Sequence, residues 1–341
     1  MINLQNPSPY LKAKNLNKPK KVASDEDWTL PALQAHLQWA VDVELYTIPF
    51  YMSAMYSIKD QSTEAGRLIK SVVNQEMLHM QSAANIANAY GTKLKIQAPL
   101  YGAEIPHLDF DLDEPNPKNI YHPYSTAIGA FDIQRLNTMC IIEYPDWSGS
   151  NSLQATDEYG SIGELYDAIA HGCELLKECI IGNHKQVNHF ERFYPDTQLT
   201  ITDSKEKGLP QVNNLINLIV DQGEGIKKDE QYIPPEYQNR VDDIQPTWDH
   251  YEKFTYLLKQ PLPDTYPIQA YGERQRKLQQ IQLSHFNEFL EIMNQTFTTG
   301  KTPDDFPTVM YKNGAAIAAC WQNGVLPMFA LSDGDKEQTH V

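Results

Sequence analysis

The sequence predicts a mainly α-helical bundle. Apolar residues recur at steps of three and four along several long segments, as on one face of an α-helix, whereas strand-like alternation is short and rare. Prolines are concentrated between residues 92 and 160, which predicts a long crossover between two sets of helices. The chain has 341 residues, enough for one large domain or two average ones.

The first two helices are expected to form an antiparallel hairpin. Thr29 as N-cap and Pro31 in the first turn predict the start of the first helix, and Pro49 predicts a kink within it. The second helix is expected over about 63–90 and ends at Gly91, a residue type that favours the helix C-terminus. A few polar residues between two long helices are typical of a bundle.

Shorter helices follow, and Ser161 with Glu164 has the spacing of a capping box at the start of one of them. The expected ranges are 126–142, 161–179, 210–221, 246–258 and 272–297. The expected organisation is an extended arm over 1–28, a helical domain over 29–300 with its crossover at 92–160, and a C-terminal extension and tail over 301–341.

The charge balance excludes some partners. Lys and Arg number 28 against 44 Asp and Glu, and the resulting charge of −16 argues against nucleic acid or an anionic membrane, which both bind basic surfaces. We find no secretory signal and no apolar run long enough to span a bilayer, so we expect a cytoplasmic protein. The four cysteines match neither a zinc pattern nor a disulfide framework, so reduced thiols are expected.

Three polar residues interrupt the apolar stripes of the first two helices. Glu44 follows Val41 by three positions, and Glu76 and His79 lie on the stripe of Val72 in the second helix. An ionised carboxylate is expensive to bury without a partner, and neither stripe carries Lys or Arg. The residues alone leave two interpretations open, which are a bound cation and a buried network of hydrogen bonds.

A metal site would explain the spacing. Glu and His at i and i+3 project from one helix face, and carboxylate oxygen with imidazole nitrogen suits iron or manganese. Dinuclear sites in helical bundles use one Glu from each of two helices and Glu-x-x-His from each of the other two. Glu-x-x-His alone is a weak signal, because Glu104 and His107 also match it in a Pro-containing segment.

Other histidines and tyrosines were weighed against this site. His36, and His171 and His285 in mirrored His-x-x-Glu patterns, are interpreted as ordinary hydrogen-bonded side chains. Tyr46, Tyr51 and Tyr56 of the first helix are candidates for redox-active groups because they lie near the proposed site, although coincidence is easy among 19 tyrosines.

Three blocks of sequence carry a family likeness. Residues 33–51, 71–80 and 84–91 resemble the ferritin-like domain of iminophenyl-pyruvate dimer synthases, which include the oxidative dimerising enzymes of violacein and related bisindole pigment pathways. The likeness continues in the same order through short blocks at 142–145, 161–166, 201–203, 221–225 and 250–254, so that it covers about residues 30–260.

The resemblance implies a ferritin-like up-down bundle with additional C-terminal helices that holds one or two iron ions, with manganese as an alternative. Its metal ligands would be Glu44, Glu76 and His79 from the first helix pair, Glu224 and His250 from the second, and Glu143 at the end of the crossover helix. A second Glu-x-x-His would need Glu at the position of Thr247. Asp243 could replace it only if the helix of His250 began before Pro246.

Two functions are therefore open. The first is a non-haem iron oxidoreductase that uses dioxygen or peroxide in the oxidative metabolism of amino-acid-derived imines. The second is a non-catalytic ferritin-like binding or structural protein with a degenerate metal site. The sequence names no small-molecule substrate, and a homo-oligomer is compatible with it.

Overall fold

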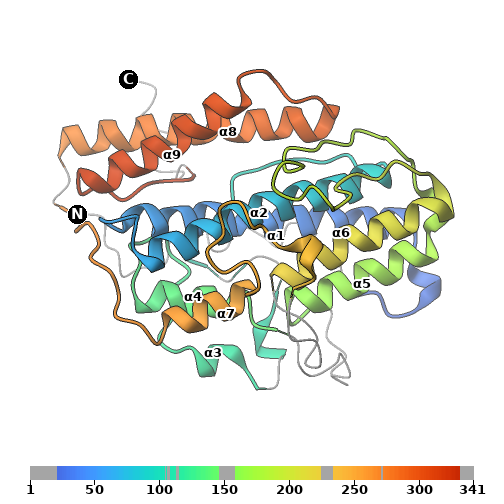
Figure 1. Cartoon of the computed structure of the whole chain (residues 1–341), viewed down its shortest axis with the longest axis horizontal. Coiled ribbons are helices and arrows are strands. Elements are labelled where there is room, and N and C mark those ends of the chain that lie inside the picture. Colours follow the sequence, from blue (N-terminus) through green and yellow to red (C-terminus); the bar gives the residue numbers. More distant parts are fainter. Residues whose placement is uncertain are drawn as a thin grey trace.

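The computed structural model describes residues 21–330 except 104, 106–107, 113–114, 146–157, 224–232 and 270–271. In this part of the chain the secondary structure is helical, and β-pairing is limited to two isolated bridges (Figure 1). The predicted α-helical class is confirmed. Residues 1–20 of the expected arm and the tail from residue 331 lie outside the described residues.

Four helices form the central bundle. They are α1 (Leu30–Ser57), α2 (Glu64–Ala89), α5 (Ile162–Leu175) and α6 (Leu209–Gln222). Helix α1 packs against α2 and α5, and α6 packs against the same two helices, so the four close into a ring around a shared interior (Figure 1). Their apolar side chains belong to one continuous hydrophobic core.

Local capping explains where the first helices begin and end. The Thr29 side chain accepts a hydrogen bond from the backbone N–H of Ala32 at 3.3 Å, and Thr63 caps α2 in the same way. Helix α1 continues through Pro49. Gly91 has φ +68° just after α2, a conformation that favours glycine and ends the helix as predicted.

The helix that the sequence predicts in the crossover is shorter in the structure. The crossover forms the short α3 (Pro117–Ile120) and then α4 (Ile133–Ile142). The expected helix from about residue 126 begins only at Ile133, because the Asp132 carboxylate accepts from the backbone N–H of Arg135 at 2.9 Å and caps it there. Helix α5 likewise ends at Leu175 instead of 179 and gives way to a 3₁₀ turn.

Helix α7 (His250–Leu257) begins later than the expected residue 246. Asp249 and Glu252 form a capping box, in which the side chain of each accepts from the backbone N–H of the other. The start of α7 is therefore fixed at His250, which places that side chain at the end of a helix. Helix α7 packs against α4 and α2.

Two C-terminal helices form a second layer. Helices α8 (Glu273–Thr299) and α9 (Phe306–Gln322) pack against each other, α8 also contacts α2, and α9 also contacts α1 (Figure 1). Helix α9 is not among the helices that the sequence predicts. Gly300 turns the chain after α8 with φ +70°, and a Cβ there would lie 2.5 Å from Cα of Lys185. The proposed boundary between residues 300 and 301 stays a prediction.

Two further expectations concern the environment of the chain. In the described residues, no helix combines the length and apolarity that crossing a membrane requires. All four cysteines are free thiols in the structure, as expected.

Candidate metal centre

The first three polar residues come from the middle of α1 and α2 and point into the bundle. Glu44, Glu76 and His79 are only 3%, 2% and 2% exposed. Nδ1 of His79 lies 3.7 Å from Oε2 of Glu44, so the two helices direct their polar groups to one place. The stripes that predicted burial therefore predicted the direction of these side chains correctly.

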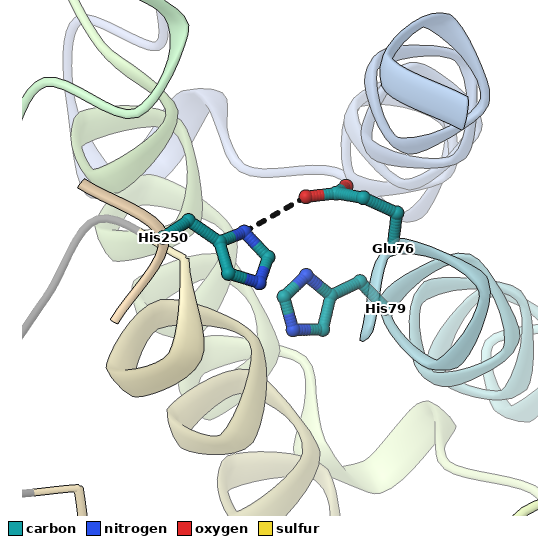
Figure 2. A group of neighbouring side chains, drawn as sticks. All are labelled: Glu76, His79 and His250. Carbon is teal, nitrogen blue, oxygen red and sulfur yellow. Dashed lines mark ion pairs between the residues drawn. The ribbon is translucent and has the colours of Figure 1, made fainter. Parts of the chain in front are cut away.

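Two more residues close the cluster from the ends of α4 and α7. Glu143 is the C-cap residue of α4, and His250 is the first residue of α7. Nδ1 of His250 lies 2.9 Å from Oε1 of Glu76 (Figure 2). The same atom lies 3.4 Å from Oε2 of Glu143. The backbone N–H of His250 donates to the carbonyl oxygen of Gly223 at 3.2 Å, which ties the start of α7 to the end of α6.

Glu76, His79 and His250 each offer a ligand atom within 4.8 Å of the other two. The two imidazole rings lie side by side with centroids 5.2 Å apart (Figure 2). Next to them is a cavity of about 10 Å³, which is room for about one water molecule or small ion. The described residues that line it are Glu44, Glu76, His79, Glu143, Ile162, Ile219, Val220 and Gly223.

Each carboxylate of the cluster accepts a hydrogen bond from a buried hydroxyl group, which fixes its orientation. Donor and acceptor oxygens are 2.5 to 2.6 Å apart in all three pairs, which are Tyr166 with Glu44, Thr47 with Glu76, and Tyr51 with Glu143. Of the three tyrosines that the sequence suggested, only Tyr51 makes such a contact. Outer hydrogen bonds of this kind are typical of metal ligands.

The tautomer of His79 follows from its neighbour. The Nε2–H₂ group of Gln222 donates to the carbonyl oxygen of Tyr237 at 2.6 Å, so its Oε1 faces His79 and accepts from Nε2 at 2.9 Å. The proton of a neutral His79 therefore lies on Nε2, and the lone pair of Nδ1 faces the carboxylate of Glu44.

The carboxylates strongly disfavour ionising together. Burial raises the pKa of Glu44 well above its usual range, the charge of Glu76 raises it further, and the hydrogen bond from Tyr166 acts in the opposite direction. Burial, followed by the charge of Glu143, also raises the pKa of Glu76, although neighbouring hydrogen bonds lower it in part. A cation that binds these carboxylates would therefore have to displace protons from them.

The two histidines shift in opposite directions. Burial lowers the pKa of His79 well below its ordinary value, and the nearby His250 lowers it further. Burial also lowers the pKa of His250, but the carboxylates of Glu143 and Glu76 outweigh it and raise that pKa to about 9. His79 is thus held neutral, whereas His250 carries the positive charge of the cluster.

A buried ion pair lies one turn along α7 from His250. Nζ of Lys253 is 2.8 Å from Oδ2 of Asp243 and donates to Oε1 of Gln75 at 2.8 Å. Asp243 is therefore the partner of a lysine, and because α7 begins at His250 it cannot share a helix face with that histidine. Thr247 lies in the turn that precedes α7.

Five of the six predicted metal ligands thus form one cluster, of which four line the cavity and His250 contacts two of those four. The five are Glu44, Glu76, His79, Glu143 and His250. Glu224 lies outside the described residues. Thr47, Tyr166 and Gln222 also belong to the site and are not among the residues predicted for it. A signal existed for Thr47 alone, which follows Glu44 by three positions on the same stripe.

His36, His171 and His285 behave as ordinary polar side chains, as predicted. His36 is buried and bonds to the carbonyl oxygen of Ala32 and the hydroxyl of Tyr159, both at 2.8 Å. His171 pairs with an aspartate at the surface, and His285 lies 3.3 Å from Glu288 on α8.

The fold and the cluster define a class of protein. It is a helical bundle whose interior holds carboxylate and imidazole side chains that could bind a metal ion. The chain belongs to the ferritin-like family, whose sequence model matches residues 37–259.

A solved structure supports the same assignment. A ferritin-like protein from Caulobacter vibrioides is 40% identical to this chain and superposes with a TM-score of 0.78, and the match covers 89% of this chain and 99% of that one. No curated protein sequence matches the chain. The ferritin-like fold expected from the sequence is thereby confirmed, together with its C-terminal helices.

Proposed function

We propose that this protein is a non-haem iron oxidoreductase in which Glu44, Glu76, His79, Glu143 and His250 hold one or two iron ions. One observation carries the proposal: three carboxylates and the imidazole of His79, all buried, line a cavity of the size of an ion, and the buried imidazole of His250 lies against two of those carboxylates. No Lys or Arg is among the described residues that line the cavity. Carboxylates gathered in this way destabilise the fold unless protons or a cation neutralise them.

The donor set fits iron. Carboxylate oxygen and imidazole nitrogen suit iron and manganese, and the described lining contains no thiolate that would favour structural zinc. Nε2 of the fully buried His250 has no hydrogen-bond partner among the described residues. Gly223 lines the cavity, and a Cβ there would lie 3.1 Å from the carbonyl oxygen of Ile219 and 3.6 Å from Oε2 of Glu143.

The chain's own residues would hold this centre in place. Tyr166, Thr47 and Tyr51 orient the three carboxylates, and Gln222 keeps the Nδ1 lone pair of His79 available to an ion. Bound iron supplies one-electron exchange with dioxygen or peroxide. The apolar side chains around the cluster limit the access of water.

The proposed substrates are imines derived from amino acids. Support comes from the resemblance to the ferritin-like domain of iminophenyl-pyruvate dimer synthases over about residues 30–260. A cavity of about 10 Å³ has no room for an organic molecule, so an imine would approach the cluster from outside it.

Metal binding is tested first. The purified chain is loaded with Fe²⁺ without oxygen, desalted, and analysed by mass spectrometry for iron. We expect at least one iron per chain, a strong loss in Glu76→Ala, and no loss in Glu288→Ala, which removes the exposed carboxylate of another His–Glu pair. Iron well below one per chain, or binding that Glu76→Ala leaves unchanged, would contradict the proposal.

Activity is tested next with an oxygen electrode. The iron-loaded protein should consume dioxygen or peroxide faster when an imine of an aromatic keto acid is present, and Glu76→Ala should abolish the increase. Iron binding without any such increase would leave a metal-binding protein and reject the oxidoreductase.

One observation favours a second candidate, a non-catalytic ferritin-like binding protein. Thr247 stands where the helical metal-site template has a glutamate, although Glu143 brings a carboxylate to within 3.4 Å of His250. This candidate requires that Fe²⁺ leave the melting temperature unchanged. A rise in melting temperature that Glu44→Ala abolishes would count against it.

A further inference from the structure

A second and larger cavity lies between the bundle and the C-terminal helices. Its volume is about 170 Å³, and it shares no lining residue with the metal centre. Three methionines and three phenylalanines provide most of the lining, which are Met77, Met293, Met310, Phe190, Phe297 and Phe306. Phe190 lies in a loop and the other five lie on α2, α8 and α9. The cavity therefore depends on helices beyond residues 37–259, the region that the family's sequence model matches.

The size of the cavity fits one aromatic ring. An apolar cavity of about 150 Å³ in another protein is large enough to bind benzene. The methionine side chains are flexible and make favourable contacts with aromatic rings. The ring of His189 already stacks on that of Phe306, with centroids 4.7 Å apart and an interplanar angle of 5°, so part of the wall is flat.

The lining carries no net charge near neutral pH. It includes no Asp, Glu, Lys or Arg among the described residues. Burial lowers the pKa of His189, so its imidazole is mostly neutral at pH 7. A charged ligand would lose its hydration without gaining an opposite charge.

One polar group in the wall lacks a partner. Gln81 is 1% exposed, and its Oε1 accepts from the backbone N–H of His189 at 2.8 Å. Its Nε2 has no hydrogen-bond partner among the described residues. An unpaired buried amide donor is destabilising, so this atom is available to donate a hydrogen bond to an acceptor on a bound molecule.

We propose that this cavity is a binding site for a small, uncharged, single-ring aromatic molecule that carries a carbonyl oxygen. The ring occupies the space among the methionines and phenylalanines, and the carbonyl accepts a hydrogen bond from Nε2 of Gln81. The proposal is independent of metal binding, because the two cavities share no lining residue.

Benzamide is the probe, and toluene is the matched ring without an acceptor. Binding to the full-length protein is measured by calorimetry and by ligand-observed nuclear magnetic resonance. Met310 lines the cavity and is half-buried, so Met310→Trp places a bulkier side chain in the cavity. Met328→Trp is the control, because it makes the same change at a half-buried methionine that does not line the cavity. Gln81→Leu removes the donor.

Benzamide should raise the melting temperature by about 5 °C at a hundredfold excess over its Kd, in the unmodified protein and in Met328→Trp. Met310→Trp should weaken its binding at least about tenfold, because the bulkier side chain occupies the space of the ring. Gln81→Leu should weaken benzamide about two- to tenfold, the effect of one hydrogen bond, and leave toluene unchanged.

Three results would overturn the proposal. They are no binding of benzamide, equal binding by Met310→Trp, and equal effects of Gln81→Leu on benzamide and toluene. If Met310→Trp does not fold, Met310→Phe replaces it with the same expectation in direction. If the unmodified protein does not bind benzamide and a folded Met310 variant changes its oligomeric state, the cavity is part of a contact between protein chains, and the proposal is also rejected.

Discussion

The ion pair beside the metal centre offers a quantitative test of how α7 is held. Lys253 follows His250 by three positions on α7, and its Nζ lies 2.8 Å from Asp243 and 2.8 Å from Gln75, the residue before Glu76. The side chains of Lys253 and Asp243 are both 0% exposed. The perturbation is Lys253→Met, which keeps the length and apolar stem of the side chain and removes its charge.

The expected magnitude follows from burial. Lys253→Met leaves the Asp243 carboxylate without its cation in a site with no access to water, and loss of one partner of a buried pair costs about 3–5 kcal/mol. For a chain of this size, the corresponding fall in melting temperature is about 4–7 °C. Lys253→Met with Asp243→Leu removes both charges, and this double variant should return to within about 2 kcal/mol of the unmodified protein.

The assay is urea unfolding of the metal-free protein followed by circular dichroism. Lys312→Met is the control, because its nearest carboxylate lies 4.0 Å away at the surface, and it should change stability by less than about 0.5 kcal/mol. We also expect Lys253→Met to weaken iron binding about 10- to 100-fold, since the pair holds His250 opposite Glu76. A cost below about 1 kcal/mol, or a double variant no more stable than the single one, would refute the reasoning.

Three further predictions concern the metal centre. The affinity for Fe²⁺ should rise with pH, because the ion must displace a proton from His250, whose pKa is raised to about 9. Chelator competition at pH 6.5, 7.5 and 8.5 (about one pH unit apart) measures this affinity, and equal affinities would contradict the expectation. Tyr166→Phe should weaken iron binding about tenfold or more, because it removes the hydrogen bond to Glu44. Tyr46→Phe is the control and should leave iron binding unchanged, because the hydroxyl of Tyr46 has no hydrogen-bond partner among the described residues; equal effects of the two substitutions in the competition assay would contradict a role of Tyr166 in the site. Gly223→Ala would place a methyl group 3.6 Å from a carboxylate oxygen of the cluster, so iron per chain by mass spectrometry should fall, and full occupancy would show that the cavity tolerates the methyl group.

The boundary of α7 shows how a local signal can be missed. A helix over 246–258 satisfies the apolar pattern, but the side chains of Asp249 and Glu252 cap a helix that starts at His250. The capping box was present in the sequence, and the longer apolar period obscured it. The consequence is functional, because a helix that began earlier would carry Asp243 on the face of His250.

Helix α9 shows the opposite case. Its residues include a run of small and apolar side chains with no sharply defined stripe, so periodicity alone gave no prediction. In the structure the helix packs against α8 on one side and α1 on another, and contacts on two sides need no single apolar face. The larger cavity lies beside it, which is why no sequence pattern pointed to that site.

The sequence by itself determined the helical class, the first hairpin and the inward direction of Glu44, Glu76 and His79. Those properties follow from the period of the α-helix and from capping, which are local. The family resemblance implied that Glu143 and His250 join Glu76, but only the tertiary structure decided how closely they meet it, and that Tyr166 and Gln222 orient the cluster. These contacts join residues far apart in the chain, and their distances depend on how the helices pack rather than on any spacing along the sequence.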